Sequence, residues 1–198
     1  MGLYDEIHHQ VFRLLETELP SFLTYHSPQH TGYVIHQAEI LSAIYEVKSK
    51  DLFMVRTAAL FHDIGFIRQY KNHEDAGCEI ASEFLKHFIS EEDINAICGI
   101  IMATKIPQSP VTLHEQIVCD ADLEYLGTDQ FYPVSQLLFQ ELHYIDHELD
   151  QAGFRQVQID FLNNHKYHTE FCKTHREPRK QLHLRQLLEE QQGVNGLV

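Results

Sequence analysis

The sequence lacks the long apolar runs that would place it in a membrane. No stretch reaches the roughly 18 consecutive apolar residues that a transmembrane helix needs, although 43% of the 198 residues are hydrophobic. That fraction and length are typical of one globular domain with a substantial core. Residues 1–10 carry Asp5, Glu6, His8 and His9, a composition unlike that of a signal peptide. We therefore expect a cytoplasmic protein with no membrane contact.

Basic residues are scarce. The chain has 15 lysines and arginines against 29 aspartates and glutamates, which gives a net charge of −14 with neutral histidines. A field of this sign repels nucleic acids and anionic membranes, so we expect neither as a partner. A small anionic ligand needs a metal ion or a local basic cluster to offset the charge.

Cysteine motifs are also absent. Cys78, Cys98, Cys119 and Cys172 are widely spaced and form no CxxC pair. We interpret them as small core residues in a reducing compartment, not as a disulfide framework or a zinc site.

Strand signals are nearly missing, which leaves helices. The chain has only 9 glycines and 6 prolines, and alternating β-branched runs hardly occur. Apolar residues recur three and four positions apart almost throughout, the spacing of an amphipathic helix. The sequence predicts an all-α, single-domain helical bundle over residues 1–190 and a disordered tail over 191–198. The expected helices cover about 3–19, 28–47, 51–64, 73–88, 91–104, 111–126, 129–150 and 154–173, and a charged helix follows them.

The most unusual segment is Leu-Phe-His-Asp-Ile-Gly at residues 60–65. An apolar run leads directly to His62 and Asp63, and Gly65 follows where a helix would end. An imidazole and a carboxylate buried there without partners would be unstable or would be neutralised by a shifted pKa. A divalent metal ion would satisfy both side chains. The alternative is that the pair only caps the helix end.

Polar residues also occur at the ends of two other apolar helices. His30 lies in the first turn of a helix that begins after Ser27 and Pro28. A helix N-terminus disfavours an imidazolium, so His30 is expected to be neutral and able to bind a metal. Asp120 and Asp122 follow an apolar run in the same way as the His62–Asp63 pair. Two histidines and two carboxylates suit a divalent ion, but spacing alone leaves open whether they converge.

These residues, taken in order, resemble a known family. Tyr25-His26-x-x-x-His30, then His62-Asp63, then Asp120-Ala121-Asp122-Leu123 is similar to the H…HD…D pattern of the HD superfamily of metal-dependent phosphohydrolases. The resemblance covers about residues 22–127 and leaves 128–190 as a helical C-terminal extension. It implies an all-α fold with a metal site between helices, whose ligands are His30, His62, Asp63 and Asp122. Asp122 is preferred to Asp120 because the last aspartate of the family commonly stands between Ala and Leu or Arg.

The resemblance also implies an activity. It implies hydrolysis of a small phosphomonoester, phosphodiester or nucleotide by a metal-activated water. Asp63 would be catalytic, and His26 matches the histidine that protonates the leaving group in cyclic-nucleotide phosphodiesterases. No Gly-Tyr-Pro follows the His-Asp pair, so the cyclic-di-GMP branch is not expected. His73 and Glu74 are candidates for acid–base work or for a second metal, and their alternative role is to begin a helix. The metal (Mn, Fe, Mg, Ni or Zn) and its number, one or two, are left open.

Candidate groups for binding the anionic substrate are few. Lys105 precedes a loop with two prolines, and a short basic cluster lies near the C-terminus: His168, Arg176, Arg179 and Lys180. Arginine can bind phosphate with two parallel hydrogen bonds. The alternative is that these residues pair with the many carboxylates of the chain, where each pair contributes little.

Two other functions stay open at this stage. Besides an enzyme, the same residues are compatible with a regulatory HD module that holds a metal or nucleotide without turnover. A two-iron oxygenase is a third reading, for which His73, Glu74 and Asp75 would supply the extra ligands. The sequence does not identify the substrate, and a homodimer is one assembly that it allows.

Overall fold

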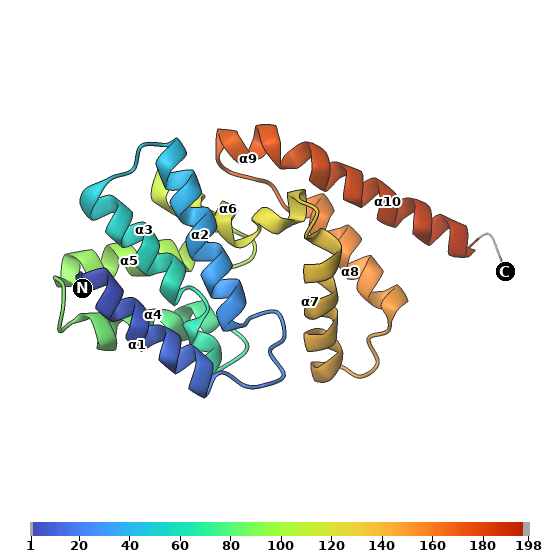
Figure 1. Cartoon of the computed structure of the whole chain (residues 1–198). Coiled ribbons are helices and arrows are strands. Elements are labelled where there is room, and N and C mark those ends of the chain that lie inside the picture. Colours follow the sequence, from blue (N-terminus) through green and yellow to red (C-terminus); the bar gives the residue numbers. More distant parts are fainter. Residues whose placement is uncertain (1, 196–198) are drawn as a thin grey trace. The chain divides into compact units, whose positions relative to one another are not determined.

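The computed structural model describes residues 2–195, and over this range the chain forms helices and no strand (Figure 1). This confirms the prediction of an all-α protein. The chain divides into two compact units, Met1–Asp122 and Leu123–Val198, which are described separately. The boundaries of one domain over residues 1–190 stay a prediction. No helix in the described part of the chain is both long and apolar enough to span a membrane.

The first unit consists of six α-helices and one short 3₁₀ helix, η1. They are α1 (Leu3–Glu18), α2 (Pro28–Ile44), α3 (Ser49–Phe61), η1 (Ile64–Ile67), α4 (His73–Leu85), α5 (Glu91–Ala103) and α6 (Leu113–Asp122). Helices α2, α3 and α6 pack directly on one another, and α5 packs on α3 and α6. Their facing side chains form a fully buried apolar core that includes Val34, Ala38, Val55, Ile97, Ile101, Ile117 and Val118. This core fixes the relative positions of the three helix ends that carry the predicted metal ligands.

Serine side chains cap two helices of this unit, one of them at the predicted start of α2. The Ser27 hydroxyl accepts a hydrogen bond from the His30 amide at 3.4 Å, and Pro28 is the first residue of α2. The Ser90 hydroxyl accepts one from the Asp93 amide at 3.3 Å, where α5 begins. Both bonds satisfy amides that have no partner within their helix.

Helices α2, α3 and α4 each end three residues earlier than expected. Helix α3 ends at Phe61 and not at residue 64, and η1 takes up the residues that follow. Gly65 is not a left-handed helix cap, because no glycine in the described range has a positive φ. It allows a close approach instead: a Cβ at Gly65 would overlap the carbonyl oxygen of His73 and lie 2.7 Å from the amide nitrogen of Gly77. The missing side chain therefore lets α4 begin directly against η1.

The second unit contains a 3₁₀ helix and four α-helices. They are η2 (Glu124–Gly127), α7 (Phe131–Ile145), α8 (Gln151–Asn164), α9 (Glu170–His175) and α10 (Glu177–Asn195). Helix α10 packs on α8, α9 and η2.

From the end of α6 onward, the helices differ from the expected ones in four ways. The expected helix over 111–126 ends at Asp122, and η2 follows it. The expected helix over 129–150 stops at Ile145, because Asp150 caps α8 by accepting a hydrogen bond from the Gly153 amide at 2.8 Å. The expected helix over 154–173 is two helices, because the Thr169 hydroxyl accepts a hydrogen bond from the Cys172 amide at 3.3 Å and begins α9. Helix α10 extends to Asn195, into the expected tail, and residues 196–198 of that tail lie outside the described residues.

The close approach at Gly65 leads to a prediction. Gly65→Ala is expected to lower the free energy of unfolding by about 3 kcal/mol, because the new methyl group overlaps backbone atoms and cannot rotate away. Gly99→Ala in α5 is the matched control, since nothing lies within 4 Å of its Cβ position. There alanine is expected to stabilise the helix by up to about 1 kcal/mol. Urea unfolding of both variants measures the difference, and equal effects would contradict the packing role of Gly65.

Candidate metal centre

Three helix ends of the first unit bring polar side chains to one point. His30 comes from the first turn of α2, His62 follows the last residue of α3, and Asp122 is the last residue of α6. Their potential ligand atoms all lie within 4.8 Å of one another. His30 Nε2 is 3.0 Å from Asp122 Oδ1 and 3.4 Å from His62 Nε2. The predicted convergence of these separated residues between helices is confirmed.

Asp63 lies against this cluster with both carboxylate oxygens. Its Oδ2 is 3.1 Å from His62 Nε2 and 3.5 Å from His30 Nε2. Its Oδ1 is 3.5 Å from His73 Nε2. Asp63 Oδ2 is buried, and no hydrogen bond of good geometry reaches it although two imidazole nitrogens lie nearby. A buried carboxylate oxygen in this state calls for a cation.

The orientation of His62 also fits a metal ligand. Its Nδ1 lies 2.8 Å from the carbonyl oxygen of Ala59, which can only accept, so Nδ1 carries the proton and donates. Nε2 then faces His30 Nε2 and the carboxylates of Asp63 and Asp122. In neutral His62 this nitrogen presents a lone pair to other acceptors. A divalent ion resolves that conflict, and a backbone carbonyl that fixes the ring is usual around metal-binding histidines.

The pKa values of His62, Asp63 and Asp122 are shifted by their mutual proximity. Burial lowers the pKa of His62, but Asp63 and Asp122 outweigh it and raise this pKa well above its usual value. Burial raises the pKa of Asp63, but His62 and His73 outweigh it and hold it well below its usual value. The pKa of Asp122 is likewise lowered, because the hydrogen bonds from His30 and His62 outweigh burial. The opposite shifts mean that His62 and the two carboxylates stabilise one another's charged forms.

His26 and His73 lie at the edge of the cluster, and their rings stack on the same aromatic side chain. The rings of His26 and His73 stack on Phe66, with centroid distances of 4.2 and 3.9 Å. The His26 and His30 centroids are 6.2 Å apart. Both His26 and His73 are partly exposed, so a ligand can reach them. Sequence reasoning missed Phe66, because an aromatic residue next to an apolar run normally signals a core position.

Glu74 and Asp120 are both buried. The Glu74 carboxylate lies 3.6 Å from His73 Nε2 and the residue is only 6% exposed. Its role as a second metal ligand or as an acid or base stays a prediction. Asp120 is fully buried, and it is not among the residues whose potential ligand atoms come together with those of His30 and His62.

The predicted substrate-binding cations have partners inside their own units. Lys105 Nζ lies 2.8 Å from Asp75 Oδ2 in the first unit. In the second unit, Arg176 pairs with the buried Glu124, and Arg179 pairs with Asp129.

Lys180 and His168 belong to the same predicted set. The Lys180 ammonium is almost fully buried, donates to the His165 carbonyl at 2.6 Å and lies 2.9 Å from Glu177. His168 lies between α8 and α9 and is half-buried. The substrate-binding role of all five residues stays a prediction.

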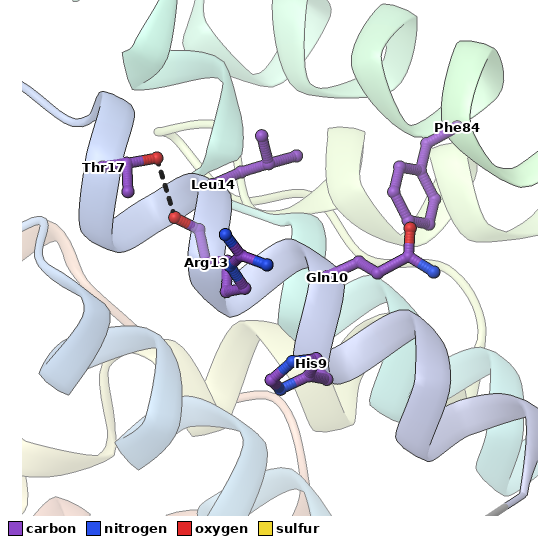
Figure 2. Close-up of a pocket in the computed structure, with 6 residues that line it drawn as sticks. All are labelled: His9, Gln10, Arg13, Leu14, Thr17 and Phe84. Carbon is purple, nitrogen blue, oxygen red and sulfur yellow. Dashed lines mark hydrogen bonds between the residues drawn. The ribbon is translucent and has the colours of Figure 1, made fainter.

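A cavity elsewhere in the first unit contains none of the predicted site residues. It has a volume of about 340 Å³ and lies between α1 and α4, as Figure 2 shows. Its lining is His9, Gln10, Arg13, Leu14, Thr17 and Phe84. The Thr17 hydroxyl donates to the Arg13 carbonyl within α1 at 2.9 Å. No carboxylate or thiol lines this cavity, so it offers no ligand set comparable to the cluster at His30, His62 and Asp122.

The raised pKa of His62 predicts coupling between metal binding and protons. A metal displaces the proton from Nε2, so binding is expected to release up to about one proton at pH 7 and to tighten as pH rises toward the pKa of folded His62. Calorimetric titration in two buffers with different ionisation enthalpies measures this release. Asp75→Asn, which changes an exposed carboxylate outside the cluster, should leave it unchanged. An affinity that does not vary with pH would contradict the assigned ligand.

The comparison with protein families agrees with this geometry. A family model described as the HD domain matches residues 29–124. Searches of curated proteins and of solved structures give no significant match. The matched range contains His30, His62, Asp63 and Asp122, whereas His26 and almost all of the second unit lie outside it. Residues 29–124 of this chain are an HD domain.

Proposed function

We propose that this protein is a metal-dependent phosphohydrolase that cleaves a small phosphomonoester, phosphodiester or nucleotide. One observation carries the proposal: two histidine nitrogens 3.4 Å apart face two ionised carboxylates in a buried cluster. HD domains are typically metal-dependent phosphohydrolases, and this cluster is typical of their metal site.

His30, His62, Asp63 and Asp122 would hold the ion. A divalent ion bound there supplies a water of lowered pKa and offsets the charge that develops on a phosphoryl group. The protein holds these ligands from three packed helices, so the site needs little rearrangement to bind. The donor set of nitrogen and oxygen atoms suits Mn, Fe, Mg, Ni or Zn.

The bordering histidines would move protons. Asp63 Oδ1 faces His73 Nε2 at 3.5 Å, so this pair is placed to take a proton from the attacking water. His26 would donate a proton to the leaving group, and its stacking on Phe66 limits the rotation of its ring. Both imidazoles are partly exposed, which agrees with contact to a bound substrate.

In the first unit, Lys105 would bind a substrate phosphate. Its pair with Asp75 involves an exposed carboxylate. Exposed pairs of this kind are weak, so a phosphate can replace the carboxylate.

The two carboxylate oxygens of Asp63 face different neighbours, which would allow a second ion. Asp63 Oδ2 faces the first cluster, whereas Oδ1 faces His73, whose Nε2 is 3.6 Å from Glu74 Oε1. Asp63 would then help to hold both ions. The ion at the border would then use His73 and Glu74.

The first test of the proposed activity is Asp63→Asn. The amide keeps the shape of the side chain but loses the charge, so hydrolysis of bis(4-nitrophenyl) phosphate with added Mn²⁺ is expected to fall by at least about 100-fold. Bound metal, measured by elemental analysis, should fall with it. Glu83→Gln is the control, because it removes an exposed carboxylate on α4 that contacts Arg68 and not the cluster.

The outcomes separate the proposed enzyme from a regulatory HD module. A wild-type protein that binds metal stoichiometrically but hydrolyses neither phosphomonoesters nor phosphodiesters would favour the regulatory module. Equal metal content in wild type and Asp63→Asn would contradict the assigned ligand set.

The second test concerns the number of ions. His73→Ala is expected to leave the ion at His30, His62 and Asp122 in place and to lower the metal content of a two-ion protein to one per chain. Loss of both ions, or no change from two, would contradict the assignment of His73 to the border site. Elemental analysis of protein purified without chelator gives the ratio.

A further inference from the structure

Two cysteines that are distant in the sequence lie side by side in the first unit. Cys78 is on α4 and Cys98 is on α5, and each thiol contacts the backbone of the other residue. Cys78 Sγ is 3.5 Å from the Cys98 carbonyl oxygen, and Cys98 Sγ is 3.6 Å from the Cys78 carbonyl oxygen. Reciprocal contacts of this kind require both thiols to lie between the same two backbone segments.

This pair differs from the other two cysteines in exposure. Cys78 and Cys98 are each partly exposed, whereas Cys119 and Cys172 are buried. The backbone beside Cys98 is open, because a Cβ at Gly99 would meet nothing within 4 Å. A small molecule from solvent can therefore reach this pair and not the buried thiols.

The surroundings give the two sulfur atoms different roles. The hydrogen bond from Cys78 lowers the pKa of Cys98, and a bond from Ser82, whose Oγ lies 3.6 Å away, acts in the same direction. The same contact and burial raise the pKa of Cys78. Of the two thiols, Cys98 therefore ionises more readily, and Cys78 lies close enough to act as its resolving partner.

We propose that Cys78 and Cys98 are a peroxide-sensitive pair whose oxidation forms a disulfide between α4 and α5. Peroxide suits the site because it is small and neutral. Glutathione disulfide is bulky and anionic, and it would approach a chain with a net charge of −14 along a helix that exposes Glu79 and Glu83. The proposal does not depend on the hydrolase activity.

The chemistry balances in two steps. The Cys98 thiolate attacks one oxygen of hydrogen peroxide, the O–O bond breaks, and the leaving hydroxide takes a proton to become water. The sulfenic acid formed on Cys98 is then attacked by the sulfur of Cys78, which forms the S–S bond and breaks the S–O bond. The second hydroxide leaves as water with the proton of Cys78. Overall, two thiols are oxidised and one peroxide is reduced to two waters.

The test uses the full-length chain, reduced and then freed of reductant. It is treated with equimolar hydrogen peroxide, alkylated with N-ethylmaleimide and mapped by peptide mass spectrometry. We expect a linked peptide pair that contains Cys78 and Cys98, with a loss of about 2 Da relative to the two thiols. Cys119 and Cys172 should be alkylated only after denaturation. Oxidation of Cys98 to sulfinic acid while Cys78 stays a thiol would overturn the proposal, as would a link between other cysteines.

Variants separate the two sulfur atoms. Cys78→Ala should leave a sulfenic acid on Cys98 that dimedone traps, whereas Cys98→Ala should leave Cys78 unmodified. Cys172→Ala, which removes a buried thiol of the other unit, should form the disulfide as the wild type does. A disulfide rate that Cys172→Ala changes as strongly as Cys98→Ala would count against the pair.

A measurement on the wild type covers the case in which a variant fails to fold. The rate of iodoacetamide alkylation at each cysteine is followed against pH by peptide mapping. Cys98 should react faster than Cys78, with a midpoint below the usual thiol value of about 8.5. Equal rates, or faster reaction of Cys78, would overturn the assignment of Cys98 as the thiolate.

Discussion

The proximity of His30 Nε2 and His62 Nε2, 3.4 Å apart between two carboxylates, is the constraint on which the site depends. Opposite charges at such distances attract by about 5 kcal/mol at an effective dielectric of 20. Removing each charged group from water costs several kcal/mol, so the cluster adds little net stability to the fold. It makes the positions of these side chains mutually dependent instead, because none of them can move without leaving a buried charge unpaired. A bound cation satisfies all of them at once.

The scaffold keeps these groups in place through ordinary packing. Three of the ligands stand at ends of helices whose apolar faces share one core, and short contacts set the orientation of the rings. The Ala59 carbonyl orients His62, and Phe66 supports His26 and His73. Gly65 lets α4 begin directly against η1, which brings His73 within 3.5 Å of Asp63. The site therefore depends on a backbone contact as much as on its ligands.

The sequence alone predicted those parts of the candidate site that carry a local sequence signal. His30 and the His62–Asp63 pair interrupt apolar helices at their ends, and Asp122 does the same, so each was recognisable where it stands. The 3.6-residue period does not distinguish the last turn of an α-helix from a following 3₁₀ turn, so the ends of α3 and α6 were predicted too late. The contact of Cys78 with Cys98 had no signal, because it joins two helices and depends on how they pack. Such a contact depends on tertiary packing, which the hydrophobic periodicity of the sequence does not reveal.

Charge sets a condition on any anionic substrate of this strongly acidic protein. One divalent ion only balances Asp63 and Asp122, so the cluster becomes formally neutral and attracts a phosphate weakly beyond direct coordination. Glu74 adds a further carboxylate beside His73, and a second divalent ion there would exceed it and leave the site positive. The number of bound ions would thus decide whether the site is neutral or positive, and therefore how strongly it attracts an anion. Since Lys105 is already paired with Asp75, bound metal ions would be the main source of positive charge for an anionic substrate.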